Sequence, residues 1–489
     1  MHKTIKLALT AATPVLLLAG CSDFLKGPGL NTNPNQPVTA TPDQLWIGVE
    51  VAVMAQYENY PLMLFMTWVQ GIAGVNRQWQ TYASYNGGTD QGAAEGAWNQ
   101  TYGPGGLRDI LTIDSANTAN GNLQWRGQTE VLEALYMGTA ADIWGDVPWS
   151  DSAGHPQKLA PMFDSQATVY AHVQALLDSA ITDLGGGGTL PAFDFFYNSD
   201  PAKWTALAHT LKARFWMHTA QTGAGVYDGA HLDSVIAEAS KGISSAANEF
   251  TPFHTSAPGS QNLFYSFQFS RAGDVMPAGT HIEAIKAAGE DAQLPVWYQP
   301  PPGVVGFYGA QAGLPVVFPM DTANHPDSIA FFEVRFDAAA SYPFVSYAEN
   351  QMLLAEAQAR RIGFATGVAT LNAYRLTLPP QPGGPGNVAA GSLGAALALI
   401  LREKFIHAFF NMEPWNDYLR TCYPNIPQPA GVNNTAPYVP GRLPVGSTEQ
   451  ATNPNVPNQN NGSNPLNANN FKLATSVDGS ACIGQAGLP

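Results

Sequence analysis

The clearest helix signal in the chain lies at residues 200–220, which read DPAKWTALAHTLKARFWMHTA. Asp200 is a residue type that caps helix N-termini, and Pro201 suits the first helical position, where its missing N–H costs nothing. Side chains that favour burial then recur at helical spacing. They predict one buried stripe, formed by Trp204, Leu207, Ala208, Leu211, Phe215 and His218.

Similar patterns extend outward from this segment and predict a mostly α-helical domain. Further helices are expected at 43–73, 124–144, 166–184, 228–247, 280–289, 346–361 and 394–411. Loops are expected at 74–106, 250–279 and 290–345, with a few short strands such as 330–336. Small residues at Ala134, Gly138 and Ala141 allow close helix packing, which suggests helix pairs of the tetratricopeptide type.

The N-terminus carries the features of an export signal. Lys3 and Lys6 precede an apolar stretch that is too short and too interrupted to span a membrane comfortably. The stretch ends Leu18-Ala19-Gly20-Cys21, a lipobox in which the Cys21 thiol takes a lipid. We expect residues 1–20 to be a lipoprotein signal peptide and residues 21–45 a lipid-anchored N-terminal segment, which holds the protein on a membrane.

Composition limits the classes of partner. The formal net charge is −15, which argues against nucleic acid because phosphates would be repelled. Residues 46–489 are expected to form a single domain whose segment from about 424 onward is rich in Asn, Pro and Gly. Export to an oxidising compartment permits a disulfide between the remaining cysteines, Cys422 and Cys482.

Motifs for catalysis, metals and cofactors are weak. The carboxylate pairs Asp142/Asp146 and Glu349/Glu356 are interpreted as helix caps and fold-holding ion pairs, with Arg214, Arg360 and Arg402 as candidate partners. The ten histidines show no metal-ligand spacing, and His218 is interpreted as a satisfied core histidine. The sequence contains no Walker A or Gly-x-Ser-x-Gly motif, so we expect neither a metal nor a cofactor.

Two groups of aromatic residues lie in polar or Pro- and Gly-rich stretches. Flat rings can cover the apolar C–H face of a sugar while Asn, Gln and Arg bind its hydroxyls. We expect a solvent-facing ligand platform from Asn76, Arg77, Trp79, Tyr82 and Tyr85, joined by Trp297, Tyr298 and Tyr308. The alternative is that these rings hold loops against the helical body.

Several segments, in order along the mature chain, resemble the SusD/RagB family of nutrient-binding outer-membrane lipoproteins. The similar segments are the lipobox, Asn33-Pro34-Asn35-Gln36-Pro37, Ala141 to Trp149, Trp204 with Leu211-Lys212-Ala213-Arg214, Ser346 to Ala357, Glu403-Lys404-Phe405-Ile406 and Glu413 to Pro424. Each motif alone is weak, and their order and spacing make the resemblance specific.

The resemblance implies tetratricopeptide-like helix pairs with a loop-rich ligand-binding portion. It also implies a partner, a SusC-like TonB-dependent outer-membrane channel, and a location on the outer membrane facing the cell exterior. We therefore expect a protein without catalytic residues that captures a glycan or oligosaccharide nutrient for this transporter. Capture of peptides is an alternative within the same family, and a surface glycoside hydrolase is the alternative from another class.

The lipobox generates a direct prediction. Cys21→Ala removes the only thiol in position to be lipidated, so the variant should be released from membranes by mild washing, whereas the wild-type protein is retained. Membrane fractionation with immunodetection measures the outcome. Cys482→Ala is the matched control, because it removes a thiol outside the lipobox. Tight membrane retention of Cys21→Ala would contradict lipid anchoring.

Overall fold

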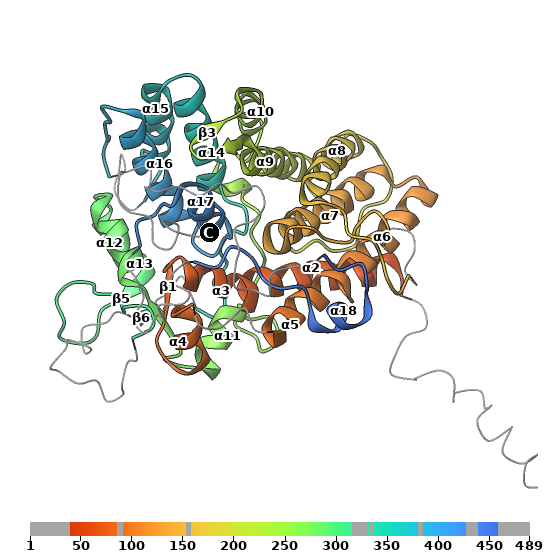
Figure 1. The fold of residues 1–489 in the computed structure, drawn as a ribbon, viewed down its shortest axis with the longest axis horizontal. Coiled ribbons are helices and arrows are strands. Elements are labelled where there is room, and N and C mark those ends of the chain that lie inside the picture. The colour runs from red at the N-terminus through yellow and green to blue at the C-terminus, as the bar shows by residue number, and fades with distance from the viewer. Residues whose placement is uncertain are drawn as a thin grey trace, which may run out of the picture.

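The computed structural model describes residues 40–85, 91–152, 158–314, 331–332, 337–379, 385–426 and 439–457. The signal peptide, Cys21 and Cys482 lie outside these ranges. Within them the chain is mostly helical, and Figure 1 shows the longer helices curving around one side of the molecule. Strands β1, β5 and β6 and the short helices α4 and α11 lie on the other side, so the predicted division into a helical and a loop-rich portion is confirmed.

The helices and strands have the following bounds. The helices are α2 (Pro42–Glu58), α3 (Tyr60–Trp68), α4 (Arg77–Ala83), α5 (Gln91–Tyr102), α6 (Leu107–Asn120), α7 (Leu123–Trp144), α8 (Gln166–Leu184), α9 (Pro201–Ala220), α10 (Gly229–Ala239), α11 (Leu263–Ser270), α12 (Gly279–Ala287), α13 (Leu294–Trp297), α14 (Tyr347–Arg361), α15 (Phe364–Arg375), α16 (Leu393–His407), α17 (Glu413–Thr421) and α18 (Ser447–Thr452). Three antiparallel strand pairs join β1 (Ile72–Gly74) to β4 (Val275–Pro277), β2 (Gln221–Gly223) to β3 (Val226–Tyr227), and β5 (Tyr298–Gln299) to β6 (Phe331–Phe332).

Helix α9 forms as its sequence predicts. The Asp200 carboxylate accepts hydrogen bonds from the backbone N–H groups of Ala202 and Lys203, and Pro201 occupies the first turn. Every member of the predicted stripe is buried. The aromatic ring of Phe215 packs where Gly138 of α7 has no side chain, since a Cβ at Gly138 would lie 2.2 Å from that ring. Glycine is therefore required for the close approach of α7 and α9.

Sequential helices pack against one another in pairs. Helix α7 packs against α8, α9 against α10, and α14 against α15, and Figure 1 shows these pairs following one another around the upper side of the view. Helices α8 and α9 also pack together, which links the first two pairs. This arrangement agrees with the predicted helix-pair packing.

The structure corrects several predicted boundaries. The helix expected at 43–73 is divided at Asn59, where the backbone is extended and Pro61 begins the first turn of α3. The described parts of the segments expected to be loops contain four α-helices, α4, α5, α11 and α13. These helices are only 4 to 12 residues long, so a helical period is hard to detect in their polar or aromatic sequences. A predicted strand position is confirmed by β6.

Buried ion pairs hold the helix pairs to the C-terminal helices. We define the ion-pair core as five carboxylates, Asp142, Glu349, Glu356, Glu413 and Asp417, and five basic residues, Arg214, His218, Arg360, Lys404 and Arg420. Arg214 of α9 binds Glu349 of α14 through two hydrogen bonds of 2.6 and 2.7 Å. The predicted partners Arg214 and Arg360 are confirmed, whereas Arg402 forms no ion pair with a described carboxylate.

His218 completes the charge balance of this core. Its Nε2 lies 2.9 Å from Glu413 Oε1, and its Nδ1 lies 2.8 Å from Asp142 Oδ1. Burial alone would lower the pKa of His218, but the two carboxylates outweigh burial and raise the pKa to about 10. The imidazole is therefore protonated at neutral pH, so the predicted satisfied core histidine is a charged one.

Cys422, directly after α17, forms a disulfide. Its predicted partner, Cys482, lies outside the described residues, so the pairing of these two cysteines stays a prediction. None of the helices in the described part of the chain is long and apolar enough to cross a membrane.

The charge of His218 predicts a pH dependence of stability. A raised folded-state pKa contributes stability that is fully present below the unfolded value of 6.5 and is lost as pH rises through about 10. The wild-type free energy of unfolding should therefore fall over this interval by on the order of a few kcal/mol more than that of His218→Gln. Denaturant unfolding of both proteins at pH 6.5, 8 and 10 measures the difference. Parallel pH profiles for the two proteins would show that His218 is neutral in the fold.

Candidate functional site

The first predicted aromatic group lies in the core. Trp79 and Tyr82 belong to α4 and are three residues apart, so both point to the same side of that helix. The Trp79 ring packs edge-on against Tyr82 and Phe267, with ring centroids 5.4 Å apart in each case, and is 2% exposed. The prediction that these rings form a solvent-facing platform is wrong, because α4 turns them toward Tyr60.

The neighbouring residues of this group have structural contacts of their own. Tyr85 is buried, and its hydroxyl donates a 3.0 Å hydrogen bond to the carbonyl of Trp68. The Asn76 side chain caps α4 by accepting a hydrogen bond from the N–H of Arg77. Arg77 itself is exposed and lies 3.4 Å from the buried carboxylate of Asp274. Of this group, Arg77 alone keeps its charged end at the surface.

The second aromatic group divides into buried and exposed members. Trp297 and Tyr298 are buried, and the Tyr298 hydroxyl lies 2.6 Å from Nδ1 of His281. Their expected exposure is therefore wrong, since α13 and β5 turn both rings into the core. Tyr308 is 49% exposed, and Lys286 Nζ lies 5.4 Å from the centroid of its ring. Tyr308 is the ring from this group that remains available at the surface.

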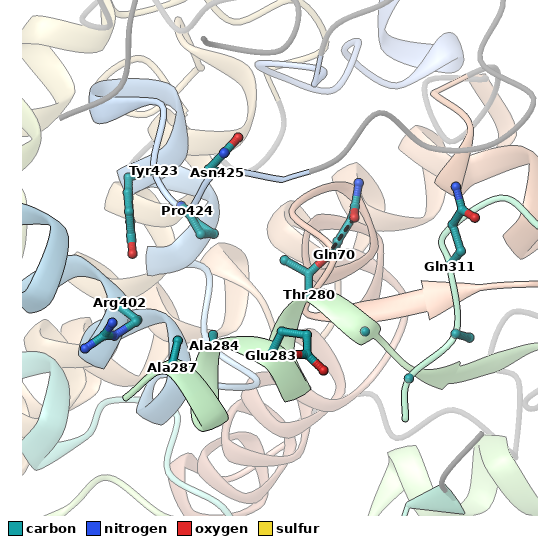
Figure 2. A pocket seen from close by; sticks show the side chains of 13 residues that line it. Gln70, Thr280, Glu283, Ala284, Ala287, Gln311, Arg402, Tyr423, Pro424 and Asn425 are labelled. Atoms are coloured by element: carbon teal, nitrogen blue, oxygen red, sulfur yellow. Dashed lines mark hydrogen bonds between the residues drawn. The ribbon is translucent and has the colours of Figure 1, made fainter. Parts of the chain in front are cut away.

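A pocket of about 480 Å³ lies beside Tyr308, and we call it the α12 pocket. It is lined by Gln70, Gly279, Thr280, Glu283, Ala284, Ala287, Gly309, Ala310, Gln311, Arg402, Tyr423, Pro424 and Asn425. Figure 2 shows Arg402 and Gln311 on opposite sides of it, with Thr280 and Gln70 between them. The size lies within the range of small-molecule sites.

The polar groups of the α12 pocket are mostly uncharged. The Thr280 hydroxyl donates a 2.9 Å hydrogen bond to the side-chain oxygen of Gln70, and the Gln70 side chain is also hydrogen-bonded to Tyr85. Gln311 and Asn425 add two more amides. Arg402 is charged, and its buried Nε has no hydrogen-bond partner among the described residues. An arginine without a carboxylate partner presents unused donors to whatever enters the pocket.

Backbone contacts hold one wall of the pocket in place. The N–H of Gly279 donates to the carbonyl of Ala310 over 3.0 Å, and the N–H of Ala310 donates to the carbonyl of Pro277 over 2.8 Å. A Cβ at Gly309 would lie 2.2 Å from the nitrogen of Gly279. The backbone segments around residues 279 and 309 can approach this closely because position 309 is glycine. This close approach places Gln311 at the pocket wall.

Acidic side chains are sparse at this pocket. Among the described lining residues, Glu283 alone carries a carboxylate, and it forms a 2.7 Å ion pair with Lys286. Glycosidases use two carboxyl groups that flank the scissile bond, one of which carries a raised pKa. The described residues that line this pocket do not supply such a pair.

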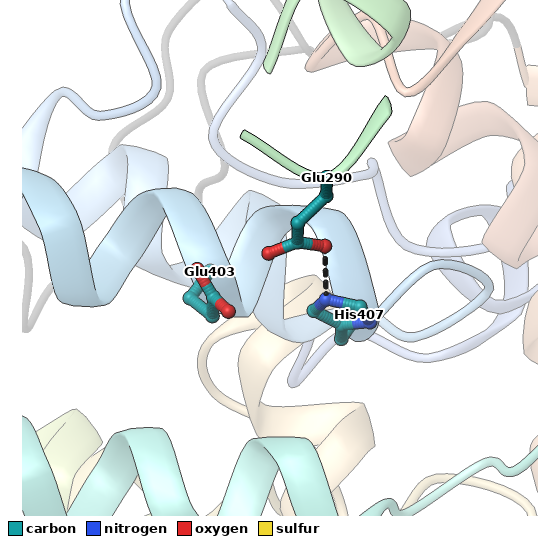
Figure 3. Close-up of side chains that lie close together, drawn as sticks. All are labelled: Glu290, Glu403 and His407. Carbon is teal, nitrogen blue, oxygen red and sulfur yellow. Dashed lines mark hydrogen bonds and ion pairs between the residues drawn. The ribbon is translucent and has the colours of Figure 1, made fainter. Parts of the chain in front are cut away.

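A buried acidic cluster lies behind the pocket, where Glu290 follows α12 and Glu403 and His407 belong to α16 (Figure 3). These three residues have metal-ligand chemistry, with ligand atoms within 4.8 Å of one another. The guanidinium of Arg375 already occupies the cluster, with Nη1 3.1 Å from Glu290 and 2.7 Å from Glu403. A divalent cation would have to displace this positive charge, so we interpret the cluster as a structural ion pair.

The residues of the α12 pocket gave little signal in the sequence. They come from five separate segments near positions 70, 280, 310, 402 and 424, and most are small residues or amides. No local periodicity or motif marks such a set, because only the fold brings it together. Arg402 was instead expected to neutralise a carboxylate of the fold.

The sequence model described as "Starch-binding associating with outer membrane" matches residues 34–378. The chain belongs to this SusD-like family. No curated protein sequence matches the chain.

Solved structures with the same fold include three informative neighbours. One is a chitin-binding protein with 19% identity and a TM-score of 0.69, covering 84% of this chain and 94% of its own. Another is a SusD/RagB family protein from Bacteroides thetaiotaomicron, with 20% identity, a TM-score of 0.68 and coverage of 88% and 98%. A third, a chitin-binding SusD homolog from Flavobacterium johnsoniae, has 17% identity, a TM-score of 0.65 and coverage of 86% and 98%.

The burial of Trp79 predicts a structural role for this ring. Trp79→Ala should lower the free energy of unfolding by roughly 3–5 kcal/mol, because it leaves a cavity among Tyr60, Tyr82 and Phe267. Gln78→Ala, on the exposed side of the same helix, is the control and should leave stability nearly unchanged. Thermal and denaturant unfolding measure both variants. An unchanged melting temperature for Trp79→Ala would contradict the core assignment.

Proposed function

We propose that this chain is an outer-membrane lipoprotein that captures a glycan at the α12 pocket and passes it to a SusC-like TonB-dependent channel. The observation that carries the proposal is the Arg402 guanidinium, which has no partner among the described residues and lines a pocket whose other polar groups are mostly neutral. A sugar presents hydroxyl groups that both donate and accept, which match the Gln311 and Asn425 amides. The family to which the chain belongs, described as starch-binding, supports the same class of ligand.

In this proposal, lipid attachment at Cys21 keeps the protein close to the channel. A lipid-anchored protein stays beside the membrane that holds the channel, so a captured glycan is released close to the channel entrance. The proposed orientation faces the cell exterior, where nutrient glycans are found. Affinity purification of the lipidated protein from membranes, with and without glycan, should recover the channel as a stable partner.

Arg402 gives a sharp test of the binding site. Arg402→Met should weaken binding of maltoheptaose or chitohexaose about tenfold or more, because a charge-assisted hydrogen bond contributes about 1.5–3 kcal/mol. Arg361→Met is the matched control, since Arg361 is an exposed helical arginine that pairs with Asp233 at the surface. Isothermal titration calorimetry measures affinity. Arg402 holds no described ion pair, so the melting temperature should change little.

The same arginine also favours the alternative ligand. A peptide ends in a carboxylate, which would form an ion pair with the Arg402 guanidinium. Titration with a pool of peptides that have free C-termini, and separately with the same peptides amidated at the C-terminus, distinguishes the two proposals. Binding of free peptides, lost on amidation and on Arg402→Met, together with no binding of either glycan, would replace glycan capture with peptide capture.

A further inference from the structure

A second cavity lies between α5, α6 and α18, and we call it the α6 cavity. Its volume is about 610 Å³, somewhat larger than that of the α12 pocket. Figure 1 shows α5, α6 and α18 on the opposite side of the view from α12. The two cavities share no lining residue. Any ligand of the α6 cavity therefore binds independently of the contacts described above.

The α6 cavity contains a buried donor without a partner. Tyr102 lines the cavity, and its hydroxyl is buried with no hydrogen-bond partner among the described residues. Burial and the nearby carboxylates of Glu449 and Asp164 raise the pKa of Tyr102 well above its usual value, so the phenol keeps its proton. A buried donor left unpaired is costly, and a ligand oxygen would remove that cost.

The two basic side chains that line the cavity are already paired with carboxylates of the protein. Arg108 lies 3.1 Å from Asp109, and Lys158 forms an ion pair with Asp151. Glu449 accepts a hydrogen bond from Asn453 over 2.6 Å. An anionic ligand would have to break one of these ion pairs and would meet the Glu449 carboxylate, so the cavity favours a neutral molecule over an anion.

The remaining surface of the cavity suits a molecule with one apolar face and many hydroxyl groups. Leu111 and Pro148 provide apolar walls, and Leu159 at the edge is 90% exposed. The Trp98 and Tyr102 rings, 4.7 Å apart, form part of the same wall. Hydroxyl oxygens of Thr112 and Ser115 offer acceptors from the exposed side of α6. Apolar walls with dispersed donors and acceptors are the features that bind sugars.

We propose that the α6 cavity is a second binding site, which takes one to three units of a neutral saccharide. The proposal rests on the proposed function only for the class of ligand, because no residue of the α12 pocket contributes to the site. A protein with two such sites can hold a long glycan at two points. The overall affinity for the glycan then exceeds the affinity of either site, although the contacts within each site are unchanged. The hydroxyl of Tyr102 and the side of α6 that carries Thr112 are the parts of the cavity to test.

The experiment uses maltotriose and triacetylchitotriose, which are too short to need both sites at once. Calorimetric titration of the full mature chain should show two sites for at least one trisaccharide. Thr112→Trp fills the cavity and should remove one site, whereas Thr118→Trp, the same change elsewhere on α6, should remove none. Tyr102→Phe removes only the hydroxyl and should weaken the second site about five- to tenfold, with no loss of melting temperature.

Combining these variants with Arg402→Met separates the two proposals. Residual trisaccharide binding in Arg402→Met that disappears on adding Thr112→Trp supports the second site. One site in the wild-type protein, abolished by Arg402→Met and unaffected by Thr112→Trp and Tyr102→Phe, overturns the second site and leaves the proposed function intact. One site lost only in the cavity variants supports the α6 cavity and overturns the α12 pocket. Failure of both trisaccharides to bind the wild-type protein overturns the saccharide assignment of the cavity.

Discussion

The fold depends on the ion-pair core, in which five acidic and five basic side chains of α7, α9, α14, α16 and α17 lie together. Removing one partner from such a core leaves an uncompensated buried charge and lowers the free energy of unfolding by about 3–5 kcal/mol. Each charged side chain therefore restricts the positions of its partners. Lys404 of α16 lies 2.8 Å from Glu413 and 3.0 Å from Asp417 of α17, while Arg214 joins α9 to α14. Helices that are remote in sequence are thereby held in one arrangement.

The shape of the α12 pocket depends on this arrangement of helices. Arg402 lies on α16, one residue before Glu403 and two before Lys404, so the helix that carries the pocket guanidinium is fixed by ion pairs on its other sides. His407 of α16 lies 2.8 Å from Glu290, which directly follows the last turn of α12. Burial and the neighbouring Glu290 carboxylate raise the pKa of Glu403. The pocket walls are thus preorganised by contacts outside the pocket.

The helical fold could be predicted from the sequence, and the candidate site could not. Caps such as Asp200 and the stripe of α9 are local signals, and the ordered motifs indicated the family before any contact was known. Trp79 and Tyr82 were assigned to a surface because their neighbours are polar, yet a 7-residue helix needs few apolar positions to bury one side. Gln70, Gln311 and Arg402 carried no signal, since their proximity is created by β1 pairing with β4 and by the packing of α12 against α16.

The composition of the α12 pocket has a consequence for how such proteins diversify. Gln311 and Asn425 belong to neither the ion-pair core nor the Glu290 cluster, and both lie on connecting segments between helices. Single substitutions at these positions change the hydrogen bonds offered to a ligand while the buried charges stay balanced. Ligand preference can therefore drift between descendants of one gene through single-codon changes, with no compensating repair of the interior. Low identity among proteins that share this fold is the expected outcome of that separation.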